Sequence, residues 1–321
     1  MRLSFLVAAC DEELFLPRCL ASLAAIRAFH PDTEILVGLD GCTDRSEAIA
    51  RGFSGVVIEV FSPRGGKHAV VNRLLERATG EIAVVHDADL EFVAGPEDLR
   101  RLEEVFSDPR VGGLADHASV TWHPEKIRRV DQALYLGDAW HSLLFLEYKT
   151  RLFAREEGGR RFLEGAGLPP LFFVNIFRRS LVTPQQTLCD DGERALQILR
   201  KGYRLALLSL ETPPYQKTLA VRFDCRSTLR ARFRGLLASR QLEEAYGIGA
   251  LPAAPRLTGY CGYVLRNLPR LRRPRAWLGL GLVAALYLLA AARLGLWKLR
   301  HAGKTPISSV EGWALRMRRH A

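Results

Sequence analysis

Two aspartates, Asp87 and Asp89, stand one residue apart at the end of an apolar run that begins at Ile82. Like charges this close repel each other, and the repulsion costs free energy unless a cation offsets it. Carboxylate oxygens are the ligands that Mg²⁺ and Mn²⁺ prefer, usually beside a phosphate oxygen. The pair therefore predicts a divalent cation at the end of a strand, close to a phosphorylated ligand.

A second phosphate-binding feature is the segment Gly65-Gly66-Lys67, which precedes a helical pattern. Backbone N–H groups at a helix start and a lysine ammonium together suit a phosphate. The spacing G-x-x-x-x-G-K-[ST] is absent, and no G-x-G-x-x-G follows the first strand-like run. These absences argue against a P-loop nucleotide hydrolase and against a dinucleotide-dependent dehydrogenase.

These polar segments need a scaffold, and the first hundred residues supply an alternating pattern. Strands are predicted over 3–9, 34–40, 56–62 and 81–87, and helices over 12–28, 44–51 and 67–78. Strict alternation predicts a parallel sheet with right-handed crossovers, and ligands bind such sheets at the carboxyl ends of the strands. All four predicted strands end in charged or glycine-rich segments, so we expect one cleft at this edge.

The second half of the chain is less regular. The pattern predicts a helix over 124–157, a strand over 171–178, and a helix followed by a strand over 189–209. The last helix opens with Asp190-Asp191 and ends at Lys201-Gly202, in accord with the helix dipole and a glycine C-cap. Acids at a helix start can simply cap it, so capping and a chemical role for Asp191 both stay open at this point.

Composition narrows the class of protein. The chain has 321 residues, of which 48 % are hydrophobic, so a large α/β core is expected. Its six cysteines match no zinc or disulfide spacing, and we expect free thiols in a reducing compartment. Strand-like sequence follows Met1 directly, and no signal peptide is expected.

The net charge of +11 is concentrated at the C-terminal end. Residues 266–321 hold ten arginines and two lysines against one glutamate, so the first 265 residues are close to neutral. This distribution disfavours a nucleic-acid partner. Within the basic region, 276–292 carries no charge, and Trp277 and Trp297 bracket a length that can span a bilayer. We predict a membrane helix over 276–297, with an interfacial helix on anionic lipid as the alternative.

Four segments, taken in order, resemble the family-2 glycosyltransferases. They are VAACDEELFLPRCLASL, ILVGLDGCTDRS, RGGKHAVVNRLLERATGEIAVVHDADLEF and CDDGERALQILRKGYRL. The resemblance covers about 1–240 and implies the α/β GT-A fold, with a mainly parallel sheet flanked by helices. It also implies transfer of a sugar from a nucleotide-diphosphate donor, usually with inversion, with Mn²⁺ or Mg²⁺ as cofactor.

The resemblance also implies domain limits. The catalytic GT-A domain would cover 1–240, with a nucleotide-binding half over 1–118 and an acceptor half over 119–240. A basic juxtamembrane segment over 241–275, the membrane helix over 276–297 and a basic tail over 298–321 would follow.

Roles for the donor side follow from the same resemblance, residue by residue. The family's N-E-E is matched by Asp11-Glu12-Glu13, which places Asp11 and Glu13 at the nucleotide sugar. Its D-D-G-S-T-D is matched from Leu39 to Asp44, so Asp40 would hold the nucleobase, with Leu39 in place of one acid. Lys67 in G-G-K would face the nucleotide.

The remaining roles concern metal and catalysis. Asp89 would hold the metal on the diphosphate, and Asp87 would contact the ribose or the metal. The family's E-D is matched by Asp190-Asp191, which makes Asp191 the candidate general base. Arg232, in RSTLRARFRGLL, would contact the diphosphate, although this segment lacks the glutamine and tryptophan of the family's Q-x-x-R-W.

The leading interpretation is a glycosyltransferase attached to the inner (plasma) membrane with its catalytic domain in the cytoplasm. The expected partners are a UDP-sugar or related donor and a lipid-linked or cell-surface glycan acceptor. Glu91 completes D-A-D-L-E, similar to D-A-D-L-Q of polyprenyl-phosphate sugar synthases, which are one alternative. A sugar-phosphate nucleotidyltransferase would need a glycine- and arginine-rich loop after the first strand, which is absent. A non-catalytic membrane-associated binding protein is a further alternative, which the clustered carboxylates disfavour.

Overall fold

A computed structural model describes residues 1–115, 131–165, 174–207, 216–217, 224–247, 253–272 and 274–300. Contacts divide the chain into two compact units, each discontinuous in sequence. The first, here called the sheet unit, comprises Met1–Trp122, Ala154–Gln186 and Asp190–Leu219. The second, the helical unit, comprises His123–Phe153, Thr187–Cys189 and Ala220–Ala321. The domain limits implied by the resemblance stay a prediction.

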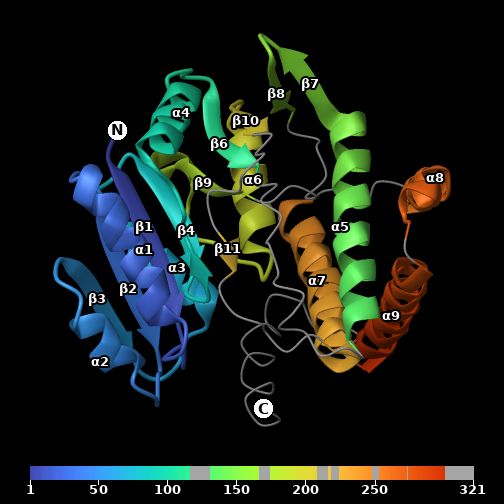
Figure 1. The fold of residues 1–321 in the computed structure, drawn as a ribbon, viewed down its shortest axis with the longest axis horizontal. Helices are drawn as coiled ribbons and strands as arrows, with labels where there is room; N and C mark the ends of the chain where they lie inside the picture. Colours follow the sequence, from blue (N-terminus) through green and yellow to red (C-terminus); the bar gives the residue numbers. More distant parts are fainter. Residues whose placement is uncertain are drawn as a thin grey trace. The chain divides into compact units, whose positions relative to one another are not determined.

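The sheet unit is built on a nine-stranded mixed sheet in the order β3-β2-β1-β4-β9-β6-β10-β8-β7 (Figure 1). The strands are β1 (Leu3–Ala9), β2 (Glu34–Asp40), β3 (Val56–Phe61), β4 (Ile82–Asp87), β6 (Val111–Ala115), β7 (Ala154–Glu157), β8 (Arg160–Leu163), β9 (Val174–Arg178) and β10 (Arg204–Leu207). The first four are mutually parallel, and Leu6 of β1 pairs with Leu36 and with Val85. A small second sheet pairs β5 (Leu90–Glu91) with β11 (Gln216–Lys217).

In the described part of the sheet unit, five α-helices accompany these strands. They are α1 (Leu16–Phe29), α2 (Ser46–Arg51), α3 (Lys67–Arg77), α4 (Pro96–Phe106) and α6 (Asp190–Arg200), with a 3₁₀ turn, η2, at Arg179–Leu181. The core is continuous between sheet and helices: Phe5 of β1 and Leu20 and Leu23 of α1 are fully buried. A parallel strand with both faces covered reads as an unbroken apolar run, which explains the sequence of β1.

The structure confirms the strands predicted over 3–9 and 34–40, and it shifts other limits. The helix predicted from residue 12 begins at Leu16, after a turn in which the carbonyl of Glu12 accepts the amides of Phe15 and Leu16. The prediction of a helix through 157 was wrong. That helix ends at Phe153, and 154–157 form the edge strand β7, paired with β8. The parts of the predictions that cover 124–130, 171–173 and 208–209 lie outside the described residues.

The helical unit contains α5 (Gln132–Phe153), α7 (Cys225–Tyr246), α8 (Ala253–Asn267) and α9 (Pro274–Arg300), with a 3₁₀ turn, η3, at Leu268–Arg270. Asp224 caps α7 by accepting the Ser227 amide, and Gly247 ends it with φ of 58°. Both α5 and α7 pack on α9. Gly137 of α5 and Gly279 of α9 meet so closely that neither has room for a Cβ. Within the described residues, Pro274–Trp297 of α9 is long and apolar enough to cross a membrane, with a mean hydropathy of 1.8.

Candidate active site

The D-x-D turn follows β4 at the carboxyl end of the four parallel strands. Lys67, the first residue of α3, donates from Nζ to Oδ1 of Asp87 at 2.6 Å, and both side chains are half-exposed. Partial desolvation works against the charged ammonium, but the carboxylates of Asp87 and Asp190 outweigh it and raise the pKa of Lys67. The lysine of the G-G-K segment and the first aspartate of the D-x-D therefore form one charged pair.

The buried side chain of His86 connects the end of β4 to the residue that follows the D-x-D turn. Its Nε2 donates to the carbonyl of Leu90 at 3.1 Å, across the two aspartates, and its ring meets Phe92 edge to face. Burial lowers the pKa of His86 to about 4, so the ring is neutral near pH 7. The histidine therefore acts as a structural tie between β4 and the residue after the D-x-D.

Asp40, at the end of β2, organises the glycine segment before α3. The buried carboxylate accepts the amide of Gly65 at 2.6 Å and that of Gly66 at 2.9 Å, and Nε of Arg64 lies 3.4 Å away. Gly66 has a φ of 91°, which a residue with a side chain rarely adopts. Asp40 thus fixes the backbone from which Lys67 projects, while its contact with a nucleobase stays a prediction.

The loops after β1 and β2 are locked to each other. Asp11, with φ of 56°, accepts the amide of Thr43 at 2.7 Å, and Glu13 accepts the amide of Arg45 at 3.2 Å. In return, Asp44 accepts the Glu13 amide at 2.9 Å. The acids predicted to touch the nucleotide sugar, Asp11 and Glu13, therefore sit on a loop pair that is already ordered.

A second cluster of ligand-type atoms lies in the same loops. Among the described residues, Asp11, Cys42 and Asp44 bring one ligand atom each within 4.8 Å of one another. Both carboxylates hold backbone amides, as described above, and burial raises the pKa of the Cys42 thiol. A metal ion binds the thiolate form of cysteine, which a raised pKa disfavours. We therefore interpret this cluster as hydrogen bonding that holds the two loops together, in preference to a metal site.

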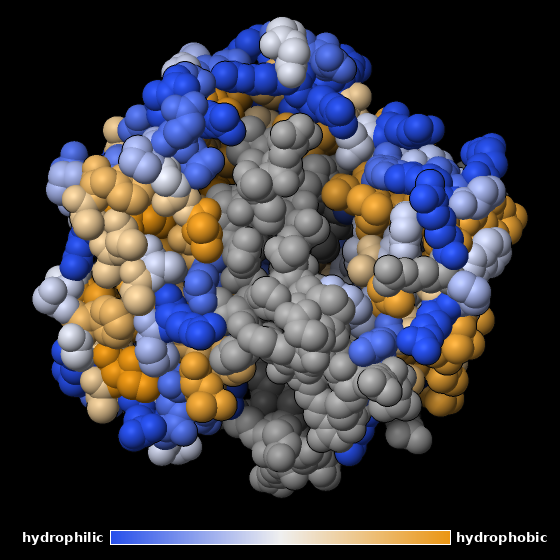
Figure 2. All heavy atoms as spheres, in the orientation of Figure 1, coloured by the Kyte–Doolittle hydropathy of each residue, from blue (hydrophilic) through white to orange (hydrophobic). Residues whose placement is uncertain are grey.

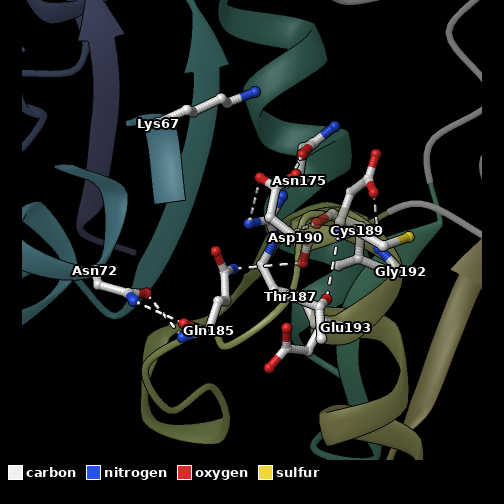
Figure 3. A network of polar contacts seen from close by, with 12 residues as sticks. Lys67, Asn72, Asn175, Gln185, Thr187, Cys189, Asp190, Gly192 and Glu193 are labelled. Carbon is white, nitrogen blue, oxygen red and sulfur yellow. Dashed lines mark hydrogen bonds and ion pairs between the residues drawn. The ribbon is translucent and has the colours of Figure 1, made fainter. Parts of the chain in front are cut away.

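The helix α6 begins with two adjacent acids, Asp190 and Asp191, whose pKa values are shifted in opposite directions. Arg194, with no exposed surface, donates to Asp190 at 3.1 Å, to the Val174 carbonyl at 2.6 Å and to Asn175 at 2.7 Å. Figure 3 labels Asp190 and Asn175, two of these partners. Burial disfavours the charge on Asp190, but Arg194 and Lys67 prevail and hold its pKa below the ordinary value. Asp190 is thus kept ionised and fixed.

Asp191 behaves in the opposite way. Burial, and then the negative charge of Asp190, raise the pKa of Asp191 to about 6 from an ordinary value of 3.8. One of its oxygens accepts the amide of Gly192 at 2.8 Å. Two neighbouring carboxylates whose pKa values are driven apart are typical of acid–base sites, where one group takes up a proton and the other stabilises charge.

Comparison with known proteins agrees with this arrangement. The family model for glycosyl transferase family 2 matches residues 4–164, about half of the chain. The chain belongs to glycosyl transferase family 2. No curated protein matches this glycosyltransferase at a significant level.

Among solved structures, mannosyltransferase PcManGT from Pyrobaculum calidifontis, in complex with GDP-Man and Mn²⁺, is similar over 98 % of this glycosyltransferase and 80 % of that chain. Its identity is 19 % and its TM-score 0.51. S. aureus TarS 1–349 in complex with UDP-GlcNAc is similar over 90 % of this chain and 81 % of its own, at 13 % identity and a TM-score of 0.46. The first of these likenesses supports the GT-A fold of the family-2 enzyme.

The sequence alone did not predict a role for several residues that position the site of this glycosyltransferase. Asn72 exchanges two hydrogen bonds with the backbone of Gln185, at 2.8 and 3.0 Å, and Glu193 accepts the Gln186 amide at 3.0 Å. These contacts tie α3 and α6 to the loop between β9 and α6. Two signals were available in the sequence. Asn72 stands five residues after Lys67 of the G-G-K segment, and Arg194 stands one turn after Asp190, at the i,i+4 spacing of an ion pair.

Arg232 lies in the helical unit, in α7. It forms an ion pair with Asp138 of α5, and its guanidinium lies 4.9 Å from the centre of the Tyr287 ring. Its proposed contact with the donor diphosphate stays a prediction.

The residues of the D-x-D turn fit a hard divalent cation. Asp87 and Asp89 offer only carboxylate oxygens, and both side chains are at least partly open to solvent. The cation of Lys67 already lies against Asp87, which shows that the turn attracts positive charge. Two carboxylates are in keeping with Mg²⁺ or Mn²⁺, which prefer oxygen ligands.

Proposed function

We propose that this family-2 glycosyltransferase moves a sugar, with inversion, from a nucleotide-diphosphate sugar to an acceptor hydroxyl or phosphate. The observation that carries the proposal is the first turn of α6, where Arg194 fixes the Asp190 carboxylate at 3.1 Å and the adjacent Asp191 is partly buried, with a pKa raised to about 6. A carboxylate with such a pKa is a better proton acceptor than a free aspartate, and it is still ionised at pH 7.

Asp191 serves as the general base in this scheme. Its carboxylate takes the proton of the acceptor hydroxyl while the acceptor oxygen attacks the anomeric carbon from the face opposite the leaving group. The bond from the anomeric carbon to the diphosphate oxygen breaks, and the nucleoside diphosphate departs with the bonding electrons. Asp190 and Arg194 keep the first turn of α6 fixed while the proton moves.

The leaving group gains negative charge as it departs, and cationic groups stabilise it. Lys67 would shift from Asp87 toward the diphosphate, and Arg232 would contact the same group. A divalent cation, Mn²⁺ or Mg²⁺, held by Asp87 and Asp89 would neutralise the diphosphate when bound. That PcManGT was solved with GDP-Man and Mn²⁺ supports a nucleotide sugar and a divalent cation here.

Asp11, Glu13 and Asp40 would bind the nucleotide part of the donor, because they order the loops at the ends of β1 and β2. We take a UDP-sugar as the working donor, from the family resemblance. The acceptor would be a lipid-linked or cell-surface glycan, and the enzyme would work at the cytoplasmic face of the inner (plasma) membrane. The apolar helix α9 and the basic residues around it support attachment to a membrane, and the cytoplasmic face is proposed from the family resemblance.

The test is donor binding and hydrolysis by detergent-solubilised full-length protein. UDP-, GDP- and dTDP-sugars are screened with Mn²⁺, with Mg²⁺ and with chelator. Calorimetry measures binding, and released nucleoside diphosphate measures turnover. We expect one donor class to bind only with metal, Asp89→Ala to lose binding, and Asp191→Asn to bind but not turn over.

The matched control is Asp32→Asn, an exposed aspartate on a loop of the same unit, which should behave as wild type. If the folded protein binds no donor with either metal, the catalytic proposal fails and the non-catalytic binding protein becomes the better hypothesis. If Asp191→Asn turns over at the wild-type rate, the base is another group.

A further inference from the structure

The helix α9 uses one side as part of the protein core. Its buried positions are 276, 279, 283, 286 and 290, with Ala276, Val283 and Ala290 at most 2 % exposed. This spacing alternates three and four residues, as in the seam of a coiled coil. Leu134 of α5 packs on this seam.

The outer side of α9 is also apolar. Leu278, Leu288, Leu289 and Leu296 are 57–74 % exposed, and the sequence places no charge between 276 and 292. Figure 2 shows hydrophobic side chains at the lower right, where Figure 1 draws α9. A helix on a water-exposed surface normally turns polar residues outward, so this face needs an apolar partner.

The neighbours of α9 argue against a transmembrane position. Near its midpoint, Tyr287 lies under the guanidinium of Arg232, which is paired with Asp138, and the ring of Tyr287 also meets His141 of α5. Farther along, the guanidinium of Arg293 lies 5.0 Å from the ring of Phe233. If α9 crossed the bilayer, α5 and α7 would accompany it and place this ion pair near the hydrocarbon centre, where charged side chains are unfavourable.

The residues that precede α9 indicate what covers its outer face. Arg266, Arg270, Arg272 and Arg275 are all exposed within ten residues. Trp277, 45 % exposed, directs its indole N–H to the carbonyl of Leu271 at 3.1 Å. Exposed arginines beside an apolar helix face, with a tryptophan at its start, match the headgroup region of an anionic membrane.

We propose that α9 lies in the plane of an anionic lipid surface, with its outer face in the lipid and both of its ends on the same side of the membrane. The inference rests on the membrane location proposed above and specifies its geometry: the enzyme is attached to one leaflet and does not cross the bilayer.

The first experiment locates the chain ends. Full-length protein carries one epitope at the N-terminus and another at the C-terminus, and sealed inside-out membrane vesicles are treated with protease before and after detergent. We expect both epitopes to be cleaved without detergent. A C-terminal epitope that is protected until detergent is added would show that α9 spans the bilayer, and the proposal would be wrong.

The second experiment tests the outer face. Protein is floated with vesicles of phosphatidylcholine alone or mixed with phosphatidylglycerol. We expect at least about tenfold more binding to the anionic vesicles, since arginines near such a surface add about 1 kcal/mol each. The double variant Leu288→Asp, Leu289→Asp should lose binding, whereas Val93→Asp, at a 50 % exposed valine of the sheet unit, should not.

A third measurement separates this proposal from the proposed function. Donor hydrolysis in detergent should be the same for the double variant and the wild type, because Leu288 and Leu289 are 74 % and 57 % exposed on the outer side of α9 and are not among the residues assigned to the donor. If neither vesicle binds the protein, but it is a dimer that the double variant dissociates, the outer face of α9 is a protein interface and the lipid proposal fails.

Discussion

The guanidinium of Arg194 lies 3.1 Å from the carboxylate of Asp190, one helical turn earlier in α6, and has no contact with solvent. Its other donors reach Val174 and Asn175 of β9, so a single side chain fastens the first turn of α6 to the sheet. The acid proposed as the base, Asp191, is the next residue along that turn. The orientation of Asp191 therefore depends on a fully buried arginine of the same helix.

Arg194→Met should destabilise the protein by about 3–5 kcal/mol, because it leaves the carboxylate of Asp190 buried without its cation. Urea unfolding followed by circular dichroism measures the change. Arg101→Met, at an arginine of α4 whose ion pair with Glu97 lies on the surface, serves as control and should change the free energy of unfolding by less than about 0.5 kcal/mol. Equal effects of the two substitutions would contradict a structural role for the buried ion pair.

Asp191→Asn should lower kcat by about 10²–10⁴-fold, because the amide cannot accept the acceptor's proton. The dissociation constant of the donor should stay within a few-fold of wild type, because the donor-contacting residues are unchanged. Single-turnover kinetics and calorimetry provide the two values. A loss confined to donor affinity would instead assign Asp191 to donor binding.

The pH dependence follows from the raised pKa of Asp191. The base must be deprotonated, so kcat/KM should fall as the pH drops through about 6, well above the 3.8 of an ordinary aspartate. The same shift acts on stability: between pH 3.8 and 6 the unfolded chain releases this proton while the folded chain retains it. As the pH rises through this window the folded state is therefore progressively disfavoured, and the effect is complete above pH 6.

The free energy of unfolding, measured at pH 4 and at pH 7.5, separates the contribution of Asp191 from that of the other titrating groups. Asp191→Asn should gain stability relative to wild type at pH 7.5 but not at pH 4. The same relative stability at both pH values would show that the pKa of Asp191 is not raised.

Lys67→Met should weaken donor binding much more than it weakens the fold. The Lys67–Asp87 pair is half-exposed, and such pairs contribute at most about 1 kcal/mol to stability. The diphosphate, in contrast, would lose a direct cationic contact. Donor titration and urea unfolding on one preparation check both halves, with Arg51→Met, which removes an exposed i,i+4 pair, as control. A stability loss that fully explains the loss of binding would contradict the prediction.

Asp40→Asn should cost about 1–3 kcal/mol of stability, because one of the two glycine amides loses its acceptor and meets an N–H group instead. The segment that positions Lys67 would then loosen, and donor affinity should drop with it. Thermal unfolding and donor titration measure the two effects. Unchanged values for both would show that the segment is held by other contacts.

The sequence predicted the parallel half of the sheet because its strands are apolar runs separated by amphipathic helices. It did not predict that β9 runs antiparallel between β4 and β6, since a single short strand carries no signal of its direction. The four residues of β7, Ala-Arg-Glu-Glu, look like the continuation of a charged helix and become a strand only because β8 offers a partner.

The candidate site, like the fold, was predicted only in part from the sequence. Charged residues at strand ends were visible in the sequence, because the parallel sheet collects those ends at one edge. The supports were not visible: Asn72 meets Gln185 across 113 positions of the chain, and Arg194 reaches β9 only in the folded protein. The opposite pKa shifts of Asp190 and Asp191 likewise depend on burial and on Lys67, which lies more than a hundred residues away in sequence.

The buried seam of α9 has a practical consequence for producing this protein. A shortened version ending before Pro274, designed to remove the apolar segment and improve solubility, would also remove the surface on which α5 and α7 pack. Leu134 and the closely packed Gly137 would then face water, and aggregation would be the expected outcome. Replacing outward-facing leucines by polar residues, while keeping the seam, is the better route to a soluble enzyme for crystallisation.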